Sequence, residues 1–133
     1  MGIFGALGIA GSGLTVHRKW LDAVSDNLAN VNDATSTSTP AFQARYVVAQ
    51  EMGGEGGVQV GGAVLSGDTT GRVVYEPGNP LADSQGNVRY PEIDTASQMT
   101  QLIIAQRGYQ ANAAVIERAT EAYQAALQIG RSA

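Results

Sequence analysis

The chain has 133 residues and contains no cysteine. This length allows one domain with a modest core, and the composition excludes a disulfide scaffold and a cysteine nucleophile. A net charge of −4 argues against nucleic acid as a partner, because nucleic-acid binding needs a basic face. The acidic excess and all four prolines lie in the middle of the chain. We therefore predict an N-terminal helix in residues 1–32, a β and loop insert in 33–92 and a long C-terminal helix in 93–133.

The first segment, residues 1–16, contains no charged side chain, and Arg18 and Lys19 follow it. A secretory signal peptide carries its basic residues before the apolar run, so this order argues against one. The run is also too short to cross a membrane. We expect a protein that has no cleaved signal peptide.

The N-terminal helix carries apolar residues in alternating steps of three and four, which places them along one face. Its strong part is predicted to start near Ser12 or Leu14 and to end near Asn30. The glycine-rich start before it predicts either fraying in a free monomer or a close approach by another helix. We expect this face to be an assembly interface. Its candidate residues are Leu7, Leu14, His17, Leu21, Val24, Leu28 and Val31.

The insert is predicted to form short strands separated by turns. Partial alternation in 42–48 and the β-branched residues in 58–60 and 72–75 indicate three strands. Glycine and proline predict turns in 53–57, 76–80 and 83–86. So little apolar content supports only a small β domain.

The C-terminal helix has a clear predicted start. Asp94 or Thr95 can cap it, and Thr95 with Gln98 matches a capping box. We expect it to run to about Gln128, with Gly130 as its stop. Its stripe residues are Leu102, Tyr109, Ile116, Tyr123 and Leu127.

The predicted fold class is mainly α with a small β insert. The terminal helices are expected to pair within one chain as a coiled-coil-like hairpin or bundle, for example with Val24 near Ile116 or Ala113. The helices carry few charges outside their stripes, which favours faces covered by other chains.

No constellation of residues indicates catalysis, a cofactor or a metal site. His17 is the only histidine, and its place on the helical stripe favours a packing role. The carboxylates of Glu51 with Glu55, or of Glu76 with Asp83, are better interpreted as solvated acidic loops. We therefore expect a protein that is not an enzyme and has no small-molecule substrate.

Three motifs carry a resemblance to a known family. The end of the first helix matches S-x-N-[I/L]-A-N-x-N with the residues Ser25, Asn27, Leu28, Ala29, Asn30 and Asn32. This motif resembles the bacterial flagellar axial proteins of rod and hook. The run Val74–Pro80 with Ala82 and Asp83, and the later R-x-Y-x-A-N at 107–112, resemble the FlgC family of proximal rod proteins. Thr39-Pro40-Ala41-Phe42 departs from the T-P-G-Y of related axial proteins.

The resemblance implies a structural subunit of the flagellar basal-body rod in the periplasm. It implies that terminal helices stack with copies of the chain and with other rod proteins into a helical tube that transmits torque. It also implies export through the flagellar type III apparatus. The alternatives are a freestanding coiled-coil adaptor and a small hydrolase that uses loop carboxylates.

Overall fold

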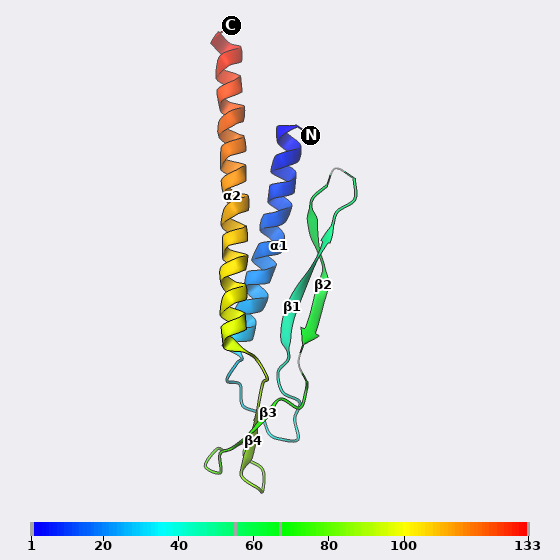
Figure 1. The fold of residues 1–133 in the computed structure, drawn as a ribbon, viewed down its shortest axis with the longest axis vertical. Helices are drawn as coiled ribbons and strands as arrows, with labels where there is room; N and C mark the ends of the chain where they lie inside the picture. Colours follow the sequence, from blue (N-terminus) through cyan, green and yellow to red (C-terminus); the bar gives the residue numbers. More distant parts are fainter. Residues whose placement is uncertain (1, 55, 67, 133) are drawn as a thin grey trace. The chain divides into compact units, whose positions relative to one another are not determined.

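The computed structural model describes residues 2–54, 56–66 and 68–132. These residues form two long helices and two small sheets, and the sheets lie between the helices in the chain order, which confirms the prediction of a mainly α protein with a small β insert (Figure 1). In chain order the elements are α1 (Ile3–Ala29), β1 (Ala44–Glu51), β2 (Val58–Ser66), β3 (Arg72–Tyr75), β4 (Asn87–Tyr90) and α2 (Thr95–Ser132).

Helix α1 includes the glycine-rich start of the chain and ends where the asparagines begin. At its end the Asp26 carbonyl oxygen accepts both the backbone N–H of Asn30 at 3.1 Å and the side-chain amide of Asn30 at 2.8 Å. A Cβ at Gly8 or Gly11 would meet no atom within 4 Å, whereas one at Gly13 would collide with the Asn112 side chain. The close approach of another helix therefore occurs at Gly13.

Helix α2 is capped by Asp94, whose Oδ1 accepts from the Ala96 N–H at 3.1 Å. The prediction of a capping box is wrong, because the side chain of Gln98 does not bond back to the start of the helix. Its polar atoms bond to Asn27 and Tyr46. The helix also continues through Gly130 to Ser132, so its predicted stop is wrong. Gly130 does not take the positive φ that ends a helix at glycine.

The insert forms two sheets of two strands each, β1 with β2 and β3 with β4. Gly54, Gly56 and Gly57 take positive φ in the turn between β1 and β2, and Glu55 lies outside the described residues. Strands β3 and β4 pair antiparallel from Arg72↔Tyr90 to Tyr75↔Asn87. Strand β4 was not predicted, because a single buried apolar residue, Val88, gives no alternation to detect.

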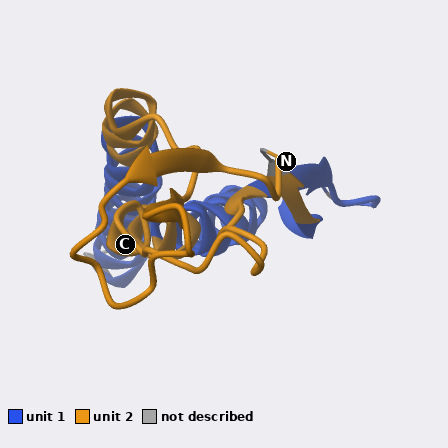
Figure 2. Ribbon diagram, turned by 90° about the horizontal axis from the view of Figure 1, so that it is seen from below, with its two compact units in different colours: residues 1–21, 47–62, 103–133 blue, residues 22–46, 63–102 orange. Residues whose placement is uncertain are grey.

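The chain forms two compact units (Figure 2). Unit 1 contains residues 1–21, 47–62 and 103–133, and unit 2 contains residues 22–46 and 63–102. Each unit takes residues from both helices and from the insert, and we describe each unit by itself.

In unit 1, α1 lies between α2 and the β1–β2 hairpin (Figure 1). The Phe4 ring meets the Tyr123 ring edge-on at 5.6 Å between centroids. Farther along, Gly13 faces Asn112 and His17 faces Gly108, so the two helices run antiparallel. In this register, the residue numbers of two facing positions sum to about 125. The expected intramolecular pairing of the helices is thus confirmed. The suggested partner of Val24 was wrong, because this register places Ile116 opposite Ile9.

In unit 2, the end of α1, the start of α2 and the β3–β4 hairpin surround a small core. Val88 and Asn27 have no exposed surface, and Gln98 is 1% exposed. Buried amides such as those of Asn27 and Gln98 are compatible with a stable core only if their polar atoms are paired.

Candidate assembly interface

The sequence-predicted interface residues of α1 lie mostly inside the fold. Val24 is buried, at 2% exposure. The others are partly buried, and they are Leu7, Leu14, His17, Leu21, Leu28 and Val31. The stripe on α1 therefore serves packing within the chain before it can serve any neighbour.

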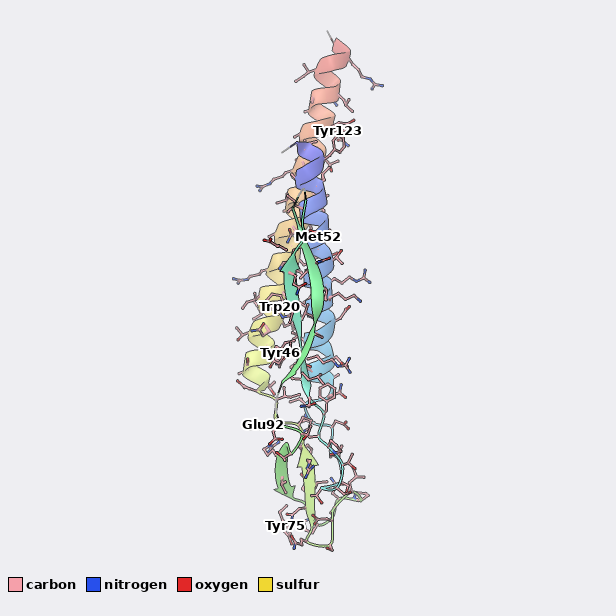
Figure 3. The ribbon with its side chains drawn as sticks, turned by 90° about the vertical axis from the view of Figure 1, so that its right-hand side faces the viewer. Trp20, Tyr46, Met52, Tyr75, Glu92 and Tyr123 are labelled. Carbon is pink, nitrogen blue, oxygen red and sulfur yellow. The ribbon has the colours of Figure 1, made fainter. Side chains whose placement is uncertain are left out.

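His17 illustrates this packing role. Its Nδ1 lies 2.8 Å from the Gly13 carbonyl oxygen, one turn earlier in α1. The other edge of the ring lies against Gly108 of α2, where any Cβ would collide with it. The Trp20 ring of the same helix, labelled in Figure 3, lies 6.0 Å from the His17 ring between centroids. The imidazole thus fills the gap that a glycine leaves between two helices.

Only part of the sequence-predicted stripe of α2 meets α1, where the Tyr123 ring contacts the Phe4 ring. Tyr109, Tyr123 and Leu127 are exposed, while Leu102 and Ile116 are partly buried. Further positions that face α1 are Gln98, Ala105 and Asn112, and each lies one residue before a position of the three–four pattern, at Met99, Gln106 and Ala113. One residue is a rotation of about 100° around a helix. The apolar stripe on α2 is therefore present, but the chain itself covers the neighbouring face.

A second group of exposed apolar residues on α2 was missed from the sequence. Its members lie outside the three–four stripe and are 47–71% exposed: Ile103, Ile104, Val115 and Ile129. Large β-branched residues off the stripe were the available signal, since an exposed helix rarely carries several of them. Apolar side chains thus extend around α2 well beyond the face that α1 covers.

The asparagine-rich motif proves to be a structural junction in unit 2. The Asn27 amide donates to the Arg45 carbonyl oxygen at 2.9 Å, and its Oδ1 accepts from the Arg45 N–H at 2.8 Å. A side-chain amide here pairs with β1 as the backbone of another strand would. Asn27 also donates to Oε1 of Gln98 at 3.0 Å, and Gln98 donates to the Tyr46 hydroxyl at 3.0 Å.

The other residues of this motif surround the junction. Asp26 pairs with Arg45 at 3.5 Å, on the exposed side of the same contact. Asn30 caps the helix, Leu28 is partly buried, and Ser25, Ala29 and Asn32 are exposed. The motif therefore joins three segments of the chain, and only part of it is open to neighbours.

The second family motif, Val74–Pro80 with Ala82 and Asp83, covers the end of β3 and part of the connection to β4. The Tyr90 hydroxyl and the Asn79 amide both donate to the Glu76 carboxylate, at 3.0 and 2.9 Å. The hydrogen bond to Glu76 raises the pKa of Tyr90. Asp83 accepts from the Asn87 N–H at 2.9 Å and from the Thr37 hydroxyl at 2.9 Å, and these bonds lower its pKa. Each carboxylate thus organises one part of the loop.

Within the described ranges, no three His, Asp or Glu side chains come together as metal donors. None of the helices described there is long and apolar enough to cross a membrane.

Comparison with known proteins identifies the family. Residues 84–129 match the family model described as the C-terminal domain of flagellar basal body rod FlgEFG proteins. The flagellar basal-body rod proteins FlgC of Escherichia coli O6:H1 and Salmonella typhimurium are each 37% identical to this chain over 87% of it and 89% of their own length. The FlgC of Bacillus subtilis is 27% identical over 98% of this chain and its full length.

The chain belongs to the FlgC family of flagellar basal-body rod proteins. The resemblance inferred from the three motifs is confirmed. So is the expected function, a structural subunit of the rod, and neither the adaptor nor the hydrolase is favoured.

Proposed function

We propose that this rod subunit assembles through its terminal helices into a helical tube that transmits torque. Its partners are copies of itself and other rod proteins of the basal body. The observation that carries this proposal is the apolar surface of α2, which α1 covers on one face only. Large exposed apolar surfaces mark interaction sites.

Family membership supports several further proposals. The chain reaches the periplasmic rod through the flagellar type III export apparatus and needs no cleaved signal peptide. It binds no nucleic acid, cofactor or small-molecule substrate, and it catalyses no reaction. The interface residues proposed are the exposed ones on α2 together with the partly buried ones on α1.

A substitution on the exposed face of α2 tests the proposal. Leu127→Asp places a charge on a side chain that is 51% exposed in the free chain, so the purified protein should keep its helicity and melting temperature. In cells the variant should be made and exported, but rod incorporation and swimming should fail, because an interface buries that charge without a partner. Gln124→Asp, at an exposed polar position three residues earlier, is the matched control. Normal swimming with Leu127→Asp would contradict the proposal.

A further inference from the structure

Strand β2 has an outer edge with no strand on it. Within the described part of the chain, β2 pairs with β1 alone. Its sequence, VQVGGAVLS, contains no charged residue and no proline. Proteins normally protect a free edge with lysine, proline or a covering element, because an open edge pairs with other chains. The missing protection indicates that assembly covers this edge.

The hydrogen bonds of β1 show which of its backbone groups face outward. Both backbone groups of Arg45 are bonded to the Asn27 side chain, so Arg45 faces away from β2. Outward and inward groups alternate along a strand. The backbone groups of Val47, Ala49 and Glu51 therefore also face away from β2, and β1 has an open outer edge beyond the residue that Asn27 closes.

The same argument applies to β2. The Val58 N–H donates to the Ser12 hydroxyl of α1 at 3.0 Å, so Val58 faces away from β1. By the same alternation the backbone groups of Val60 and Val64 also face away from β1. The outer edge of β2 is therefore closed at Val58 and open from Val60 onward.

We propose that the open edge of β2 binds the open edge of β1 in a second copy of this chain, which continues the antiparallel sheet from one subunit to the next. The inference rests on the proposed function, because it needs neighbouring copies in the rod. If two neighbouring copies have the same orientation, β2 of one copy lies beside β1 of the other. The two strands then run antiparallel, as β1 and β2 do within one chain. Pairing of β2 with β2 would instead be symmetric and would close as a dimer, whereas a head-to-tail contact can repeat along a tube.

Alignment of the two open stretches gives a specific contact to test. Val60–Val64 of one copy runs against Val47–Glu51 of the next, which places Ala63 opposite Val48. Both side chains are exposed in the free chain, and the native chain has no cysteine to interfere. Facing residues in such a pair bring their Cβ atoms to about 5 Å, within reach of a disulfide after a small adjustment.

The experiment co-expresses two versions of the full chain in one cell, one with Ala63→Cys and the other with Val48→Cys. Basal bodies are isolated, oxidised and analysed on a non-reducing gel. A band at twice the chain mass should form when the two versions are present together and not with either version alone. Because each chain carries one cysteine, the band reports a contact between subunits only. Gln50→Cys in place of Val48→Cys tests a register shifted by two residues.

Cysteines at Ile104 and Leu127 on α2 provide the comparison. Cross-links there, with none at the hairpin in either register, would overturn the sheet contact and leave the proposed function intact. A doubled band with Ala63→Cys alone would overturn it in favour of symmetric pairing. Loss of both the hairpin and the α2 cross-links would contradict the proposed function as well.

Discussion

Both helices contain many apolar residues, but α1 buries most of its large apolar side chains fully or partly and α2 leaves most of its own exposed. Helix α1 buries Ala10, Val16 and Val24, and Phe4 is its only large apolar side chain that the described structure leaves exposed. Helix α2 buries only Gln98 and Ala105, and its exposed apolar residues are Met99, Ile103, Ile104, Tyr109, Val115, Tyr123, Leu127 and Ile129.

The difference follows from what each helix touches. In unit 1, α1 has α2 on one side and the β1–β2 hairpin on the other, whereas the contacts described for α2 in this unit are with α1. Most apolar residues of α2 are therefore exposed in the single chain, whereas most of those of α1 are covered by other parts of it. In the free chain, the apolar residues of α1 should therefore contribute to the free energy of unfolding. The exposed apolar residues of α2 should contribute almost nothing to it.

The comparison predicts its largest contrast for one charge placed on each helix. Val24→Asp buries an unpaired carboxylate in α1 and should cost about 4 kcal/mol of unfolding free energy. Ile104→Asp, at a side chain that is 47% exposed on α2, should change the unfolding free energy by less than about 0.5 kcal/mol. Urea unfolding of the two purified variants measures both values. Equal losses would show that the exposed face of α2 is covered in the free chain.

The amide junction should give the next largest effect. Asn27→Ala removes both bonds to the Arg45 backbone and one to Gln98, so buried polar groups lose their partners at a cost of about 3 kcal/mol. Asn32→Ala, at an exposed position of the same motif, is the matched control and should be near neutral. A neutral Asn27→Ala in urea unfolding would show that water replaces the amide.

A smaller loss is expected where the two helices approach most closely. Gly108→Leu forces the His17 ring out of its place and should cost about 2 kcal/mol by overpacking. Gly130→Leu, on the same helix with no atom near its Cβ position, should not destabilise the chain. The double variant with His17→Ala should recover part of the loss. A penalty at Gly130 as large as that at Gly108 would mean that both faces of α2 are packed.

The smallest effect is expected at Asp83, outside both helices. Hydrogen bonds from Asn87 and Thr37 lower the pKa of this carboxyl in the folded state. Its contribution to stability is therefore present above the ordinary aspartate pKa of about 4 and is lost as pH falls through the lowered value. Asp83→Asn should lower the melting temperature slightly at neutral pH and converge with the native protein in acid. A constant difference across that range would exclude the carboxylate charge as the cause.

Much of the fold could be predicted from local sequence signals. The helices and the first three strands follow from periodicity and turn residues, which act over a few neighbours. The direction of the stripe on α2 could not be predicted, because it depends on the register with α1, which Gly13 and Gly108 set through close contacts. The continuation of α2 past Gly130 was missed because a glycine ends a helix only where the chain also turns.

The candidate site was predictable in part for a related reason. Low charge on the helices indicated that the chain associates with other chains. The family motifs indicated that its partners are proteins of the flagellar rod. The role of Asn27 could not be predicted, since its partners Arg45 and Gln98 come from two other parts of the chain. An apolar stripe identifies a surface that needs cover, but it does not distinguish cover by the same chain from cover by the next.

The amide junction also constrains the order in which the chain can fold. Asn27 and Gln98 are 71 positions apart in the sequence, so their bond closes a very long loop. Contacts of such separation form late, after local helices and hairpins. Because Gln98 lies near the start of α2, the junction cannot close before that part of the chain is available. Completion of unit 2 therefore depends on the last third of the chain.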